Sequence, residues 1–145
     1  MNTQESEYLL LLQKMPEEIV RVVSEFLPVR TIMWLNKNFY IKYHKKVRSM
    51  IAPKLYDNYI RDMVRLDNSF VFKFIAKENI MRWVCEKNII YKNVSYPNFL
   101  SFLNDFTIRN NSTKCRNLLQ SIFDEMGLSK NQHKKNRYVN IRWRT

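Results

Sequence analysis

The chain of 145 residues contains a single glycine, Gly127, and this scarcity constrains its fold more than any other feature. Glycine is the residue that most readily adopts the positive φ angles of tight hairpin turns. A chain with one glycine is therefore expected to form few hairpins. Because apolar residues make up 46% of the chain, a core can still form. We predict an all-α fold, a single compact helical domain over residues 1–145.

Apolar spacing and capping residues predict where the helices begin and end. In the stretch from Met15 to Pro28, Pro16 suits the first helical position, and Glu17 and Glu18 lie where the helix dipole favours negative charge. Asn36 is expected to cap the helix that follows, and Gly127 to close the last one. Helices are expected at residues 4–13, 16–26, 29–35, 36–51, 53–64, 70–76, 79–90, 97–106 and 113–126.

The final segment has a different period. In RYVNIRW, Val139, Ile141 and Trp143 alternate with polar or charged residues. A period of two predicts a short strand or an extended tail that docks through these three side chains. We treat residues 128–145 as this basic tail.

The distribution of charge is more informative than the net charge of +12. Residues 26–56 carry seven bases and no acid, and residues 127–145 carry six bases and no acid. Such surfaces attract nucleic acid, anionic lipid or an acidic protein, although the same charge can simply keep a surface soluble. The candidate basic residues are Lys42, Lys45, Lys46, Arg48, Lys134, Lys135, Arg137, Arg142 and Arg144.

Aromatic residues interleave with the lysines of residues 36–54. Phe39, Tyr40 and Tyr43 could stack on bases while the lysines contact phosphates, as in nucleic-acid-binding proteins. The same spacing suits an amphipathic helix with its rings inward and its lysines outward, and we favour this second interpretation.

The sequence gives little support for catalysis, metal binding or a cofactor. His44 and His133 lack neighbouring ligands at metal-binding spacing, and one glycine cannot form a phosphate-binding loop. We therefore expect a protein that is not an enzyme, with no metal and no cofactor. Cys85 and Cys115 are expected to be buried and reduced, and the apolar run at residues 8–12 is too short to span a membrane.

Two stretches resemble a known family. MPEEIVRVVSEFLP, residues 15–28, resembles the start of an F-box, and LNKNFY, residues 35–40, resembles the end of the F-box pattern. The resemblance covers about residues 14–42. It implies a three-helix module that binds the linker subunit of SCF ubiquitin ligases. The face implied for binding comprises Met15, Pro16, Ile19, Val23, Leu27, Pro28, Ile32, Leu35 and Phe39.

An F-box-like module followed by helices rich in Asn and Lys is similar to proteins of large DNA viruses. That resemblance implies a viral protein located in the host cytoplasm or nucleus, or in the virion. Two functions remain open: an adaptor that binds an SCF linker subunit, and a small basic structural protein of a virion or nucleoprotein assembly. The adaptor requires the face between Pro16 and Ile32 to be exposed in the isolated chain, whereas a structural protein would bury it.

Overall fold

The structure is a computed structural model, and it describes residues 11–12, 14–127 and 137–138. The chain divides into two compact units, Met1–Tyr56 and Asp57–Thr145, which we describe separately. The expectation of a single compact domain stays a prediction. The helix expected at residues 4–13 lies almost wholly outside the described residues.

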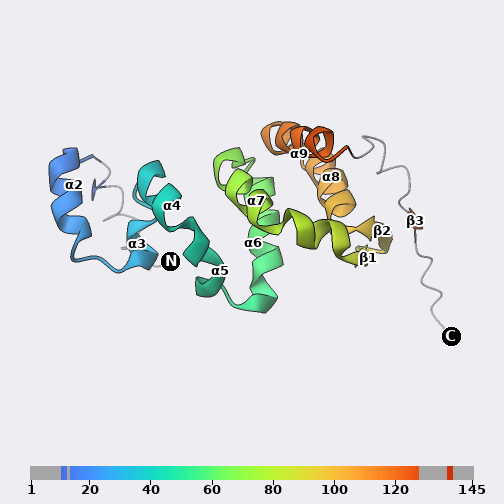
Figure 1. Cartoon of the computed structure of the whole chain (residues 1–145), viewed down its shortest axis with the longest axis horizontal. Coiled ribbons are helices and arrows are strands. Elements are labelled where there is room, and N and C mark those ends of the chain that lie inside the picture. Colours follow the sequence, from blue (N-terminus) through green and yellow to red (C-terminus); the bar gives the residue numbers. More distant parts are fainter. Residues whose placement is uncertain (1–10, 13, 128–136, 139–145) are drawn as a thin grey trace. The chain divides into compact units, whose positions relative to one another are not determined.

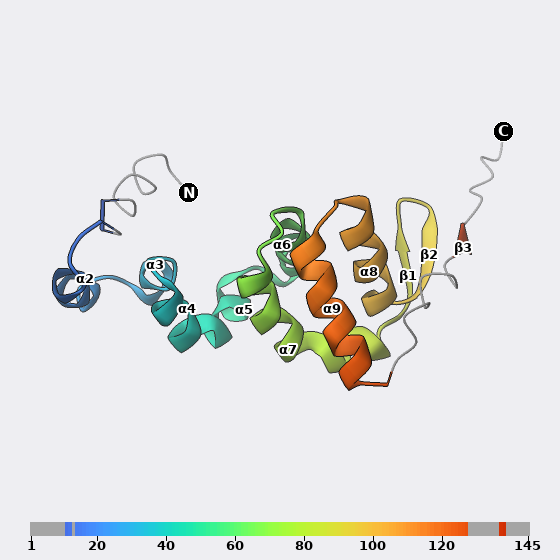
Figure 2. The same cartoon turned by 90° about the horizontal axis from the view of Figure 1, so that it is seen from above.

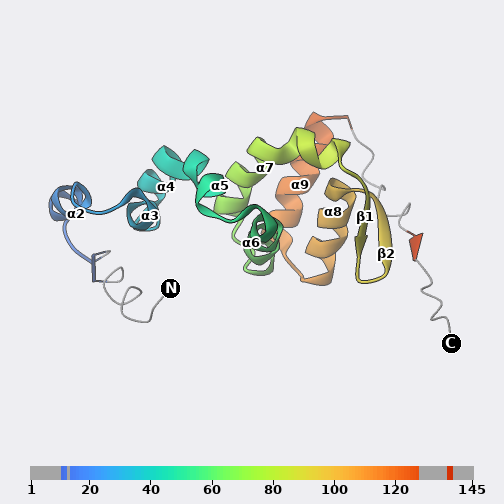
Figure 3. The same ribbon diagram turned by 90° about the horizontal axis from the view of Figure 1, so that it is seen from below.

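Short helices make up the described part of the first unit. They are α2 (Glu17–Ser24), α3 (Val29–Ile32), α4 (Lys37–Tyr43), the 3₁₀ turn η1 (His44–Lys46) and α5 (Val47–Met50), which follow one another in Figures 1 and 3. The single helix expected at residues 36–51 is therefore interrupted by η1. Two helices and most of a third lie within residues 14–42, but the F-box arrangement of this segment stays a prediction.

Prolines and one asparagine start the first three of these helices. Pro16 and Pro28 each lie immediately before a helix, and their carbonyl oxygens accept the first helical hydrogen bonds, for example from Ile19 N at 3.1 Å. The Asn36 side chain accepts a hydrogen bond from Phe39 N at 2.9 Å and so caps α4, as predicted. Local sequence signals thus account for the starts of these three helices.

The second unit combines helices with a small antiparallel sheet. Its elements are α6 (Pro53–Arg65, across the boundary), α7 (Ser69–Cys85), β1 (Lys87–Tyr91), β2 (Val94–Asn98), α8 (Phe99–Arg109), α9 (Thr113–Glu125) and β3 (Arg137–Tyr138). Figure 2 shows α9 beside α7 and α8, and the β1–β2 hairpin beside α8. Helices predominate, as predicted, but the small sheet means that the fold is not strictly all-α.

The hairpin forms without glycine because other residues take the positive φ angles. Lys92 and Asn93, the two residues between β1 and β2, have φ values of 46° and 64°. Asparagine tolerates this region better than most residues. The helix expected at residues 79–90 consequently ends at Cys85, and β-forming residues such as Ile89 and Ile90 enter β1.

The two helices expected at residues 70–76 and 79–90 also form one helix, α7, since no residue between them interrupts the helix. An asparagine caps α7 in the same way as Asn36 caps α4, and the role expected for Gly127 is confirmed. Asn68 caps α7 by accepting a hydrogen bond from Val71 N at 3.2 Å, and Gly127, with φ of 64°, follows the end of α9.

The predicted tail strand is described only at Arg137 and Tyr138. These residues pair antiparallel with Ser95 and Val94 of β2 as the short strand β3. The remaining predicted docking residues, Val139, Ile141 and Trp143, lie outside the described residues.

Aromatic rings form the core of the second unit. The Phe102 ring of α8 lies with its centroid 5.0 to 5.4 Å from the rings of Tyr91 and Tyr96 in the hairpin and of Phe99 and Phe106 in α8. Each such pair adds about 0.5–1.5 kcal/mol beyond the burial of its area. The hairpin is therefore held to α8 mainly by rings.

A carboxylate from the loop before α7 caps α9 at a distance of almost fifty residues in sequence. Asp67 accepts hydrogen bonds from Cys115 N at 2.8 Å and Lys114 N at 3.1 Å. The hydroxyl of Ser112, the residue preceding α9, instead donates to Val64 O at 2.6 Å. Partial burial raises the pKa of Asp67, but the hydrogen bonds from Cys115 and Lys114 outweigh it, and the net pKa is lowered.

We expect Asp67→Asn to lower the free energy of unfolding by about 1 kcal/mol at pH 7, because asparagine tolerates the same φ but offers one acceptor oxygen instead of two. A carboxyl group whose pKa falls on folding stabilises the fold above its unfolded pKa. The difference in the free energy of unfolding between this variant and the unmodified chain should shrink as the pH falls below 3.8, the usual pKa of an aspartate. Urea titrations at several pH values would measure it.

Asp62→Asn provides a control for this prediction, since Asp62 forms only an exposed ion pair with Arg65 and its loss should cost less than about 0.5 kcal/mol. Equal losses in the two variants, or a loss at Asp67 that does not depend on pH, would contradict the assigned role.

The hairpin turn generates a second prediction. Asn93→Ala should lower the free energy of unfolding by about 1 kcal/mol, because alanine is strained at positive φ, whereas Asn93→Gly should not destabilise the chain. Urea denaturation of both variants would test this. If alanine and glycine gave the same stability, the turn would not depend on positive φ at this position.

Candidate functional site

An apolar stripe along α2 is exposed to solvent. Ile19 and Val22 lie on one side of α2, and Met15 and Phe26, which flank the helix two residues beyond its ends, continue the same intervals of four, three and four residues. In chain order, the exposed fractions of the four side chains are 43%, 48%, 52% and 83%. We call these four residues the α2 stripe. A surface helix of a compact unit normally turns such a stripe toward the core, so its exposure indicates a contact surface.

The opposite side of α2 faces the interior of the first unit. Val20 and Ser24 are buried, and the Ser24 hydroxyl donates to Arg21 O at 2.7 Å. Val20 and Ser24 of α2 therefore pack inward, while Ile19 and Val22 point outward. This orientation leaves the α2 stripe available to a partner.

The residues of the predicted F-box-like face do not all lie on one accessible surface. Met15, Pro16, Ile19 and Pro28 are exposed, while Val23, Leu27 and Phe39 are half-buried. Ile32 and Leu35 are exposed by only 6% and 4%, and this corrects their assignment to a binding face. Both contribute to the core of the first unit, Ile32 from the end of α3 and Leu35 from the residues that follow this helix.

Two members of the stripe were absent from the predicted face. Val22 and Phe26 are the most exposed of the four, yet the F-box pattern drew attention to Val23 and Leu27 instead. The helical spacing with Met15 and Ile19 contained the necessary signal. It could not show which side of the helix packs inward, since both sides carry apolar residues.

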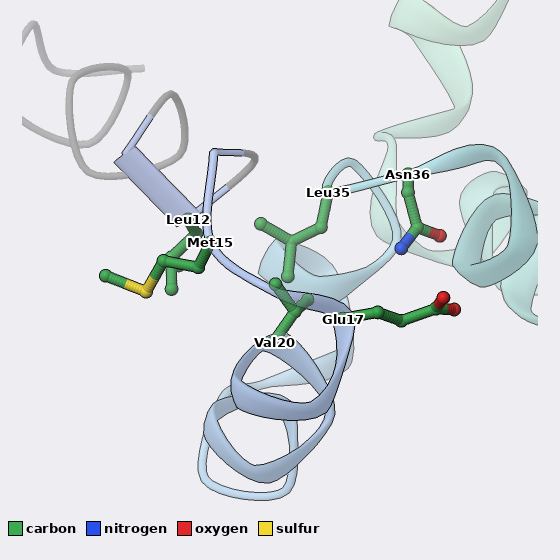
Figure 4. A pocket seen from close by; sticks show the side chains of 6 residues that line it. All are labelled: Leu12, Met15, Glu17, Val20, Leu35 and Asn36. Atoms are coloured by element: carbon green, nitrogen blue, oxygen red, sulfur yellow. The ribbon is translucent and has the colours of Figure 1, made fainter.

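A shallow pocket adjoins the stripe. It has a volume of about 200 Å³ and is lined by Leu12, Met15, Glu17, Val20, Leu35 and Asn36. In Figure 4, Val20 and Leu35 point toward one another, with Leu12 and Met15 on one side and the polar Glu17 and Asn36 on the other. Met15 belongs to both the pocket and the α2 stripe. The pocket could therefore accept an apolar side chain of a partner bound along α2.

The described basic residues of the first unit lie on its surface. Lys42, Lys45, Lys46 and Arg48 are exposed, whereas Tyr40 is buried and Phe39 and Tyr43 are half-buried. The expected arrangement, rings inward and lysines outward, is confirmed here. Arg137 lies in β3, and the other predicted tail bases, Lys134, Lys135, Arg142 and Arg144, lie outside the described residues.

The described residues offer no cluster of three or more His, Cys, Asp or Glu side chains that could hold a metal ion. None of the helices in the described ranges is both long enough and apolar enough to cross a membrane. The absence of an enzymatic activity or a cofactor stays a prediction.

The two cysteines differ, which corrects the expectation that both are buried. Cys85 is exposed at the end of α7, whereas Cys115 is buried. Burial, together with the neighbouring Asp67 carboxylate, raises the pKa of the Cys115 thiol to about 12.

We expect Cys85 to react readily with a thiol reagent at pH 8 and Cys115 to react only after unfolding, because the thiolate is the reactive form. Alkylation followed by mass spectrometry would measure both sites, with Cys85→Ser and Cys115→Ser variants to assign the signals. Rapid modification of Cys115 in the folded chain would show that its environment is open.

No family model, curated protein or solved structure significantly matches this chain.

Proposed function

We propose that the chain is a non-enzymatic adaptor that docks a partner protein along α2, and that the partner is the linker subunit of an SCF ubiquitin ligase. The exposed α2 stripe carries the proposal. The resemblance of residues 15–28 to the start of an F-box supports the identity of the partner. The alternative, a structural virion protein, would require the face between Pro16 and Ile32 to be covered. Pro16, Ile19 and Pro28 are exposed, which favours the adaptor, although Ile32 is buried.

The energy of docking would come mainly from burial of the stripe. Fully burying an exposed Ile, Met, Val or Phe side chain contributes about 1.5–3 kcal/mol, and these residues are already partly covered, so each would contribute less. Phe26 is the largest and the most exposed, at 83%, and therefore has the most apolar area to bury. We assign it the role of the main anchor, as aromatic side chains are common energetic centres of interfaces.

Charged residues beside the stripe define the rim that a partner must match. Glu18 and Glu25 are exposed, and helical geometry places them on the same side of the stripe about two turns apart, with the exposed Arg21 between them. A partner helix or groove with an apolar centre and basic residues facing these acids would complement the surface. Such rim charges would favour one orientation of the partner over the reverse.

The adaptor proposal predicts that the full-length chain co-purifies with the linker subunit in a stoichiometric complex at moderate salt. The double variant Ile19→Asp with Phe26→Asp should weaken the complex by about 100-fold or more, because two interface anchors become charged groups that must be desolvated. Both residues are exposed, so circular dichroism should show unchanged helix content.

Ile41→Asp is a matched control in the same unit, because Ile41 is 49% exposed and Ile19 is 48% exposed, but Ile41 lies on α4. This variant should retain the complex. Failure of the unmodified chain to bind the linker subunit would reject the proposed partner. Equal losses in the control and the double variant would reject the α2 stripe as the binding surface.

A further inference from the structure

A second surface of the first unit lies on different helices and is basic. Lys42, Lys45, Lys46 and Arg48, which we call the α4–α5 basic face, are all exposed within seven residues of chain. No acid occurs between residues 26 and 56. None of the four forms an ion pair with a carboxylate in the described ranges, and the ion pairs recorded there lie in the second unit. Among the described residues, therefore, no carboxylate neutralises the basic face.

Aromatic rings hold several of these cations in place. The Nζ atoms of Lys42 and Lys46 lie 5.2 and 5.7 Å from the centre of the Tyr43 ring, and the guanidinium of Arg48 lies 5.5 Å from that of Tyr56. A cation over a ring at this distance gains about 0.5–1 kcal/mol at an exposed site. These contacts already restrict the side chains of the three cations. Less conformational entropy is therefore lost when the cations bind an anion.

Three neighbouring rings of the same unit come from the turn before α4, from α4 and from η1. The Trp34 ring lies 5.7 Å from the Tyr40 ring, and the Tyr40 ring is stacked 6.4 Å from the His44 ring. Tyr40 is buried, but Trp34 is 38% exposed and His44 is half-buried. Part of the Trp34 ring is therefore exposed to solvent, and the buried Tyr40 ring packs against it.

We propose that the α4–α5 basic face and Trp34 together bind single-stranded nucleic acid. Lysine and arginine side chains contact the phosphates, and a base stacks on Trp34. The proposal is independent of the adaptor function, because it uses neither the α2 stripe nor the linker subunit. Binding through this face would hold the chain, and any partner docked on α2, near nucleic acid.

The exposed ring distinguishes this ligand from other polyanions. An acidic protein would satisfy the lysines but would not require an exposed indole surface. A lipid surface would require a broad apolar face beside the cations. Between residues 29 and 56, however, the large apolar side chains exposed in the described structure are only Trp34, Ile41 and Leu55.

The test is fluorescence anisotropy of the full chain with a labelled 20-nucleotide oligo(dT), measured over a series of salt concentrations. Replacing all four residues of the basic face with glutamine should weaken binding at least about tenfold at low salt. It should also reduce the slope of log K against log salt by about 3, since each phosphate contact contributes about 0.7 for a single strand.

Trp34→Ala tests the stacking contact separately. It should weaken binding about five-fold or more, because stacking of one base contributes about 1–3 kcal/mol. The salt slope should stay unchanged, since no charge is removed.

Lys45→Glu provides a milder charge variant should the fourfold variant lose its fold. Lys45 is exposed and has no recorded ring contact, and the variant should also weaken binding several-fold.

A matched control removes the same number of charges elsewhere. Lys73, Lys77, Lys87 and Arg116 are exposed cations of the second unit, and their replacement with glutamine should change affinity less than about twofold. Equal losses in both fourfold variants would show that net charge alone drives binding and would overturn the proposal. Unchanged binding by Trp34→Ala, or competition by polyglutamate or anionic phosphatidylserine vesicles as effective as that by unlabelled oligo(dT), would overturn it as well.

Discussion

The turns of this chain depend on residues other than glycine that adopt positive φ. Asp67 lies in the link between α6 and α7, Lys92 and Asn93 form the hairpin turn, and Asn111 precedes α9; all have positive φ angles. Each position would normally favour glycine. The use of Asn and Asp allows the turn residues to contribute side-chain hydrogen bonds as well. Asp67 illustrates this, because the residue that bends the chain after α6 also caps α9.

That constraint explains both the success and the failure of sequence-based reasoning. The helix starts at Pro16, Pro28, Asn36 and Asn68 could be predicted, because each rests on a local interaction. The hairpin could not be predicted from the scarcity of glycine, since that argument treats positive φ as a property of glycine alone. The cap of α9 by Asp67 could not be predicted either, because it joins residues far apart in sequence.

The candidate site was predictable in kind but not in detail. The spacing of apolar residues around Ile19 indicated an amphipathic helix, and its resemblance to an F-box indicated a binding role. Burial of Ile32 and Leu35, and exposure of Val22 and Phe26, depend on which side of α2 packs inward. Tertiary packing decides that orientation, and periodicity alone does not contain it. The surface proposed to contact the partner therefore includes Val22 and Phe26, and it excludes Ile32 and Leu35, which belong to the face that the family pattern implies.

The central claim is that the α2 stripe is open in the isolated chain and covered by the linker subunit. The most direct test introduces cysteine at Val22 in a Cys85→Ser background and follows its reaction with a maleimide. The account predicts a rate close to that of an unfolded thiol, because Val22 is 52% exposed, and strong protection when the linker subunit is added. Slow reaction in the isolated chain, or unchanged reaction in the presence of the linker subunit, would contradict it.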